Sequence, residues 1–210
     1  DGDYVRNGDT LMEVSGNTLS ILKAERLVLN CMQRMSGIAT LTHKMVKLLD
    51  GLDTKILDTR KTTPGFRYIE KWAVRIGGGV NHRFGLYDMI MIKDNHIDFS
   101  GGIANAIQNT QAYLKQHNKE LHICIEARTL SDVAEILERG SVDRIMLDNF
   151  SVEQLKEAVE QIQGKYETEA TGGINFDTIR SYAETGVDYV SVGALTHSAG
   201  SLDISLIAVD

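Results

Sequence analysis

The chain has 210 residues and a formal net charge of −7, and 42% of its residues are hydrophobic while 24% are charged. These values are ordinary for a soluble globular protein with a full core, and the acidic balance argues against binding to nucleic acid or to an anionic membrane. Cys31 and Cys124 lie in apolar runs without a C-x-x-C motif, which predicts reduced thiols in a cytoplasmic protein. No apolar stretch reaches the roughly 20 residues that span a bilayer.

Residues 1–20 contain two turns rich in Asp and Gly around short strand-like runs, which is typical of the edge of a small β unit. The chain starts without Met inside this pattern, so we expect a further segment before it. From residue 21, apolar side chains recur at helical spacing over about thirty residues. Ser36-Gly37 interrupts this pattern and predicts a kink or a break between two helices.

From residue 55 the sequence consists of short β-rich segments, and helical patterns lie between the last five of them. The segments are KILDTRK (55–61), MIMIKDN (89–95), HICIEAR (122–128), RIMLDN (144–149), YETEATGG (166–173) and YVSVGAL (189–195). Alternating strands and helices indicate a parallel sheet, and runs such as MIMI fit strands that are covered on both faces. No G-x-G-x-x-G follows the first strand, so we predict an α/β barrel of about six strands rather than a dinucleotide-binding fold.

Nearly every predicted strand ends in ionisable or glycine-rich residues. Because the carboxyl ends of barrel strands meet on one face, these residues predict a common pocket there. They are Asp58, Arg60 and Lys61, then Lys93 and Asp94, Glu126, Asp148 and Asn149, Thr171 with Gly172 and Gly173, and Gly193.

Cations are concentrated at these strand ends although the chain as a whole is acidic. Arg60, Lys61 and Lys93 follow strands, and His82-Arg83 lies in the stretch GGGVNHRFG. Any one of them could be a solvated surface side chain, but their joint placement favours a multiply anionic small molecule. The glycines before His82 are either a flexible loop or a place where backbone approaches a ligand closely.

Glu126 and Asp148 lie at the ends of neighbouring strands. As an isolated pair they could be salt-bridge partners. Facing a cationic pocket, they could ligate Mg²⁺, bind ribose hydroxyls or stabilise a developing positive charge.

The last two strand-end loops have features of a phosphate site. Gly172-Gly173 stands between a strand and a helix start, where backbone N–H groups bind phosphate, and VSVGALTHS supplies a second glycine loop with His197. The remaining histidines have no partners at metal-ligand spacing, and neither Ser-x-x-Lys nor Gly-x-Ser-x-Gly supports acyl transfer.

Several stretches together resemble quinolinate phosphoribosyltransferase, the decarboxylating nicotinate-nucleotide pyrophosphorylase of NAD biosynthesis. They are ERLVLNCMQRMSGIATLT, KILDTRKTTPGFR, EKWAVRIGGGVNHRFGLYDMIMIKDNHI, RIMLDN and AETGVDYVSVGALTHSAGSLDISL. The resemblance implies an N-terminal β-sandwich domain followed by an irregular α/β barrel of about six parallel strands. We expect residues 1–20 to be a remnant of the sandwich domain, residues 21–54 a helical lead-in, and residues 55–210 the catalytic barrel.

The resemblance also implies roles for individual residues. Arg60, Lys61, His82, Arg83 and Lys93 line the pocket for quinolinate and pyrophosphate. Arg26 matches an arginine that the family supplies across a homodimer interface to the neighbouring site. Glu126 and Asp148 match carboxylates near the ribose and Mg²⁺, and the 5′-phosphate loops contain Thr171, Gly172, Gly173, Gly193 and His197.

Two positions depart from the family pattern. Cys124 replaces the first carboxylate of a frequent Glu-x-Glu, and Thr171 replaces a serine while keeping the hydroxyl. The implied reaction joins quinolinate to phosphoribosyl pyrophosphate. The alternatives are a related phosphoribosyltransferase that acts on another aromatic acid, and a catalytically silent relative that binds a phosphate ligand.

Overall fold

The computed structural model describes residues 1–209, and its six strands form one parallel sheet in the order β1-β6-β5-β4-β3-β2. The strands are β1 (Lys55–Leu57), β2 (Ile90–Ile92), β3 (Ile123–Ala127), β4 (Arg144–Asp148), β5 (Glu167–Thr171) and β6 (Tyr189–Ser191). The helices are α1 (Thr18–Lys47), α2 (Arg67–Ile76), α3 (Asp94–Ser100), α4 (Ile103–Gln116), α5 (Leu130–Arg139), α6 (Val152–Ile162), α7 (Ile179–Ala183) and α8 (Ala194–His197).

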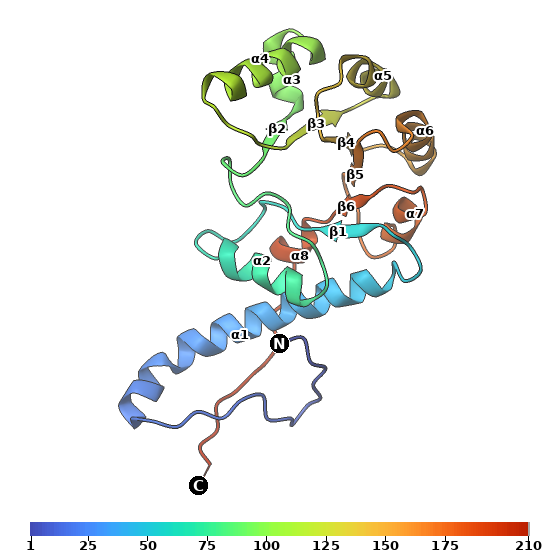
Figure 1. Ribbon diagram of the computed structural model, residues 1–210. Coiled ribbons are helices and arrows are strands. Elements are labelled where there is room, and N and C mark those ends of the chain that lie inside the picture. The colour runs from blue at the N-terminus through green and yellow to red at the C-terminus, as the bar shows by residue number, and fades with distance from the viewer. Residues whose placement is uncertain (210) are drawn as a thin grey trace.

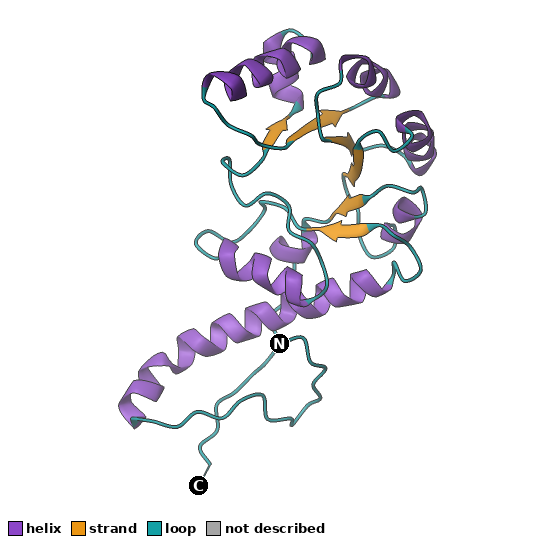
Figure 2. Cartoon of the chain, in the orientation of Figure 1, coloured by secondary structure: helices purple, strands orange, loops and turns teal. Residues whose placement is uncertain are grey.

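The sheet curls into an open ring with β1 and β2 at its two ends, and helices lie on its outer side (Figures 1 and 2). All five residues of β3 are buried, and so are the first four of β4, because helices cover one face and barrel side chains cover the other. The predicted six-stranded α/β barrel is therefore confirmed.

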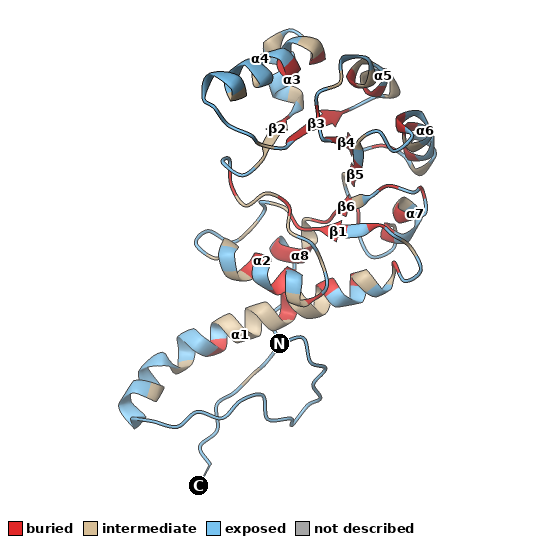
Figure 3. Ribbon diagram, viewed as in Figure 1, coloured by how far each residue is buried: buried red, intermediate tan, exposed pale blue. Residues whose placement is uncertain are grey.

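The helices on the far side of the ring begin at side-chain caps that the sequence supplies. Thr129 caps α5 and Ser151 caps α6, each within a capping box that satisfies two free backbone N–H groups. Each helix buries an apolar stripe against the strands, which Figure 3 shows as buried residues on the inner side.

The ring is irregular because β1 and β2 do not pair with each other. The segment after α2 lies beside β1 instead: Val80 N donates to Ile56 O at 2.8 Å, and Asp58 N donates to Val80 O at 3.1 Å. This single bridge carries Asn81, His82 and Arg83 to the carboxyl end of β1.

The predicted break at Ser36-Gly37 is wrong, because α1 is one helix of 30 residues. Gly37 is there for close packing. A Cβ at this position would lie 1.8 Å from the carbonyl oxygen of Gly200, so only glycine lets the C-terminal segment approach the helix. The glycine therefore marks a backbone contact rather than a helix end.

Two other features of the local structure did not follow from the sequence. Residues 1–17 form no strand, since strand-like runs become strands only when a partner takes their backbone hydrogen bonds. Helix α2 did not stand out in the sequence because Phe66 at its start offers no side-chain cap and because its buried positions include Glu70 and Lys71.

Candidate active site

The strand register brings the predicted residues to one end of the barrel. Glu126 is level with Met146 across β3 and β4, and Asp148 is level with Thr171 across β4 and β5. Lys93 follows the last residue of β2, and Arg60 and Lys61 lie just beyond β1. The carboxyl ends of the strands therefore lie at one end of the barrel, which we call the mouth, and the common pocket that the sequence predicts there remains a prediction.

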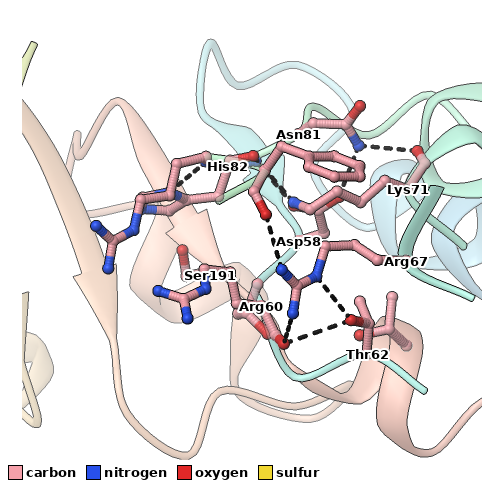
Figure 4. Close-up of polar contacts among 12 residues, drawn as sticks. Asp58, Arg60, Thr62, Arg67, Lys71, Asn81, His82 and Ser191 are labelled. Atoms are coloured by element: carbon pink, nitrogen blue, oxygen red, sulfur yellow. Dashed lines mark hydrogen bonds and ion pairs between the residues drawn. The ribbon is translucent and has the colours of Figure 1, made fainter. Parts of the chain in front are cut away.

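Asp58 is fully buried at the carboxyl end of β1 and holds the segment Asn81–His82 in place. Its carboxylate accepts from Lys71 Nζ, from Asn81 Nδ2 at 2.6 Å and from the backbone N–H of His82 at 2.8 Å (Figure 4). Burial raises the pKa of Asp58, and the contact with Lys71 opposes that rise. Because Lys71 also donates to His82 O at 2.9 Å, the buried pair fixes the backbone of the loop from both sides.

Arg83 follows this segment and lies half-buried. Its Nη1 donates to Met89 O at 3.1 Å, while its Nε is buried and has no hydrogen-bond partner. Burial and the nearby charge of Arg60 lower the pKa of Arg83. An arginine in that state has donor capacity left for an anion.

Arg67 connects the loop that carries Arg60 and Lys61 to the loop that carries Arg83. Its Nε donates to Thr62 Oγ1 at 3.0 Å and its Nη1 to Phe84 O at 3.0 Å, so the guanidinium stands between the loops in Figure 4. Nothing in the sequence distinguished Arg67 from a surface arginine, because its function depends on a loop 17 residues away.

Arg60, Lys61 and Arg83 form no ion pair with a carboxylate within residues 1–209. The fold therefore gathers three cations at the mouth without a carboxylate of the described residues in direct contact with any of them. Such an arrangement is costly without a ligand and favours binding of a multiply charged anion.

The opposite side of the mouth carries carboxylates. Lys93 Nζ lies 3.3 Å from Glu126 Oε1, and Asp94 N donates to Glu126 Oε2 at 3.1 Å. Burial and then the charge of Glu126 raise the pKa of Asp148. Glu126 and Asp148 are thus close enough to repel each other, which is the situation a bound cation relieves.

The glycine loops at β5 and β6 are fixed by tight contacts. Gly172 has φ +105°, and a Cβ there would lie 2.2 Å from Asn149 Oδ1. At Gly193 a Cβ would lie 3.1 Å from His197 Nε2 and 3.3 Å from Lys61 Cδ. Lys61 and His197 therefore flank the same glycine, next to the backbone at the start of α8.

Arg34 and Glu70 form a clamp behind these loops that the sequence did not reveal. Arg34 Nε donates to the fully buried Glu70 at 3.0 Å, and its other donors reach the carbonyls of Thr196 and Ala199. Glu70 in turn accepts from Thr63 N at 3.0 Å and Thr63 Oγ1 at 2.8 Å. Helix α1, helix α2 and both loops are joined at one point.

Two predicted site residues lie apart from this mouth. Arg26 is exposed on the first half of α1, the half that extends past the barrel in Figure 1. His82 is 7% exposed and turns its ring inward, toward Glu169. Their proposed contacts with substrate remain predictions.

Two hollows lie away from the mouth. One of about 440 Å³ is at the amino ends of β1, β5 and β6, and one of about 280 Å³ is between β2 and α4. The first is lined by four carboxylates and by a single cation, Lys55, so it does not favour an anionic ligand as the cations of the mouth do. In the described part of the chain, no helix combines the length and apolarity needed to cross a membrane.

Comparison with known proteins places the chain in a family. The profile described as "Quinolinate phosphoribosyl transferase, C-terminal domain" matches residues 38–207, and the corresponding N-terminal domain profile matches residues 1–36. An Arabidopsis thaliana protein named nicotinate-nucleotide pyrophosphorylase [carboxylating], chloroplastic, is 51% identical over 98% of the chain. A Bacillus subtilis protein named probable nicotinate-nucleotide pyrophosphorylase [carboxylating] is 45% identical over 98% of the chain and is covered over 70% of its length.

The crystal structure of NadC from Streptococcus pyogenes superposes with a TM-score of 0.92 at 44% identity, covering 99% of this chain and 72% of that one. A nicotinate-nucleotide pyrophosphorylase structure from Pyrococcus furiosus shares the fold at 16% identity, with a TM-score of 0.66. The chain spans 63% of the length of the Arabidopsis relative.

Proposed function

Because the chain belongs to the quinolinate phosphoribosyl transferase family, we propose that it transfers the phosphoribosyl group of phosphoribosyl pyrophosphate to quinolinate with decarboxylation. The products are nicotinate mononucleotide, pyrophosphate and CO₂, and the pathway is de novo NAD biosynthesis. The observation that carries this proposal is the set of cations at the mouth that have no carboxylate of residues 1–209 in direct contact, above all Arg83 with its buried unpaired Nε.

Both substrates are polyanions, and binding them together requires several cations at fixed positions. Arg60 and Arg83 are suited to the two carboxylates of quinolinate, since a guanidinium matches a carboxylate in two parallel hydrogen bonds. The side chain of Lys61 lies against Gly193, which supports a role at the phosphates of the donor. Fixed cations in a partly dry mouth act with less screening than they would in water.

The chemistry needs no side-chain nucleophile. As pyrophosphate departs, the ribose ring acquires positive charge, and Glu126 and Asp148 stabilise it electrostatically. The ring nitrogen of quinolinate then bonds to the ribose carbon and becomes a cationic pyridinium. This cation accepts the electron pair of the adjacent C–CO₂⁻ bond, so CO₂ leaves and a proton takes its place. Positioning of the two reactants accounts for much of the acceleration.

Glu126 and Asp148 also fit a magnesium ion that arrives with the substrate. Residues 1–209 hold no cluster of three or more His, Cys, Asp or Glu side chains that could bind a metal alone. Mg²⁺ commonly takes one or two carboxylates plus substrate phosphates, and when bound here it would neutralise the departing pyrophosphate. The raised pKa of Asp148 means that its ionised form is a cost to the fold as the pH rises, and a bound cation offsets that cost.

A homodimer with shared sites is part of the proposal. The first half of α1 exposes Leu19, Leu22 and Leu27 at fractions of 67%, 59% and 66%. An unpaired apolar face of this kind supports an interface, and Arg26 stands among these side chains. The proposed location is the cytoplasm, supported by Cys31 and Cys124, which are both free thiols.

The test is release of pyrophosphate from phosphoribosyl pyrophosphate by the full-length protein, with quinolinate present and absent. We expect release only with quinolinate, accompanied by one CO₂ per turnover. Equal or faster release with another aromatic acid, such as nicotinate, would show a different acceptor. Binding of phosphoribosyl pyrophosphate without any release would contradict the enzyme assignment.

A further inference from the structure

The interior of the barrel holds an ionic network that the proposed chemistry does not use. Glu169, in the middle of β5, is fully buried, and its Oε1 accepts from the hydroxyl of Ser191. Its Oε2 accepts from Arg144 Nη1 at 3.1 Å. Replacing a whole buried ion pair with hydrophobic side chains of similar volume is often neutral for stability, so stability alone does not account for this buried carboxylate and its partners.

The network below Glu169 prevents its carboxylate from moving. Arg144 donates to Glu167 Oε2 from Nε at 3.0 Å and from Nη2 at 2.7 Å, and its guanidinium lies 4.1 Å from the ring centre of Tyr189. Burial raises the pKa of Glu169, but contacts with His82, Ser191 and Arg144 outweigh it and leave that pKa lowered. Glu169 is therefore a fixed negative charge.

His82 joins this network to the mouth. Its Nδ1 accepts from the backbone N–H of Arg83 at 2.7 Å, and this contact favours the tautomer with the ring proton on Nε2. Nε2 is buried and lies 3.3 Å from Glu169 Oε2, off the line of a good hydrogen bond. Within residues 1–209, no other carboxylate lies within ion-pair distance of this ring.

The consequence extends to Arg83. If the proton moved to Nδ1, it would point at the N–H of Arg83 and replace a hydrogen bond with a clash. The Arg83 guanidinium donates to Met89 O at 3.1 Å, and this contact depends on where the backbone of Arg83 lies. A shift of the Arg83 backbone would therefore move the guanidinium within the mouth.

We propose that Glu169 is a positioning residue, which holds His82 in the Nε2–H tautomer and thereby sets the backbone and the guanidinium of Arg83 at the mouth. The effect on quinolinate binding rests on the proposed function, whereas the tautomer does not. Glu169 would act through His82 and never touch the substrate.

The experiment records long-range ¹H–¹⁵N correlation spectra of the histidine rings in ¹⁵N-labelled full-length protein. His82 is identified by the signal that disappears in the His82→Asn variant. The wild-type protein should show a protonated Nε2 and a bare Nδ1, and Glu169→Gln should convert this into a mixture of tautomers. The same substitution should raise the KM for quinolinate about tenfold, the usual scale when the partner of a site residue is lost, and change kcat less.

Glu167→Gln is the matched control, because Glu167 contacts Arg144 from the same strand but does not reach His82. It should leave both the tautomer and the KM unchanged. If Glu169→Gln fails to fold, Glu169→Asp keeps the charge beside Arg144 while shortening the reach to His82, and it should give the same mixture.

A wild-type His82 with a protonated Nδ1 overturns the proposal. It is also overturned if the Nε2–H tautomer persists in the folded Glu169 variant, or if Glu167→Gln has an equal effect. A wild-type protein that shows the expected tautomer but releases no pyrophosphate contradicts the proposed function alone.

Discussion

The side chains of Arg83 and Lys61 differ in burial and in hydrogen bonding. Arg83 is half-buried, held by the carbonyl of Met89 and left with an unpaired Nε, whereas the side chain of Lys61 is exposed beside Gly193. Under the proposed function, Arg83 is the preorganised fork for a carboxylate, and Lys61 is the compact point charge for phosphates. Both owe their placement to Asp58 and Thr196, since Asp58 holds the backbone before Arg83 and Thr196 Oγ1 donates to Lys61 O at 2.8 Å.

Replacing either cation should abolish turnover without loss of the fold. We expect Lys61→Ala and Arg83→Ala to lower quinolinate-dependent pyrophosphate release by about 100-fold or more, the scale on which a lost electrostatic contact to the transition state acts. The melting temperature of Lys61→Ala should stay near that of the wild type, because exposed side chains contribute little to stability. Lys165→Ala, an exposed lysine at the other end of the barrel, serves as the control. Near-normal activity in a folded Lys61 or Arg83 variant would contradict the site.

At the scale of elements, the loop between β1 and α2 is held by a turn and by a clamp. Phe66 N donates to Thr63 O at 3.0 Å, with Pro64 and Gly65 in between and Gly65 at φ +78°. This is the pattern of a type II turn, in which proline presets the first central residue and glycine allows the second. The carboxylate of Glu70 accepts hydrogen bonds from the backbone N–H and the hydroxyl of Thr63. The loop that carries Arg60 and Lys61 is therefore fixed before substrate arrives.

Loosening that turn should affect binding more than folding. Pro64→Ala restores freedom to the unfolded chain, which lowers stability by about 0.4–1 kcal/mol, and the Glu70 clamp still holds the native loop. We expect the KM for quinolinate to rise several-fold while the melting temperature falls by only a few degrees, measured by steady-state kinetics and thermal unfolding. A large loss of stability with unchanged KM would show that the proline serves the fold and not the site.

At the scale of the whole molecule, the site is assembled from most of the chain, but Arg26 lies outside it. Helix α1 contributes Arg34 to the clamp in its second half, while its first half extends beyond the barrel (Figure 1). One helix thus supports its own site at one end and presents Arg26 and an apolar face at the other. That geometry favours a composite site in which a second copy receives Arg26.

Complementation between two inactive variants tests this arrangement. Arg26→Ala and Lys93→Ala should each lose activity, and mixing them under conditions of subunit exchange should restore about a quarter of it. Half of the dimers would be mixed, and each mixed dimer would rebuild one of its two sites. Native mass spectrometry confirms that mixed dimers form. If they form and no activity returns, Arg26 does not act across an interface.

The sequence alone was sufficient for the barrel, the family and the strand-end residues. Alternating apolar strands and helices specify a parallel sheet, and parallel strands bring their carboxyl ends to one face whatever the side chains are. Arg60, Lys61, Lys93, Glu126 and Asp148 could therefore be assigned to one mouth from their positions in the chain.

Only the tertiary structure decided which residues hold that mouth in place. The sequence does not distinguish Lys71, Glu70 and Arg34 from charged residues on the exposed face of a helix. It does not distinguish Glu169 from an ordinary polar residue in a strand. Their roles arise from contacts between residues that are distant in the sequence, such as Lys71 with Asp58, 13 residues apart, and Arg34 with Glu70, 36 residues apart. A buried charge is stable only when an oppositely charged or hydrogen-bonding side chain contacts it. The local sequence pattern does not show which distant residue makes that contact. The same reason explains why Gly37 looked like a helix break when it is the place where two distant backbones touch.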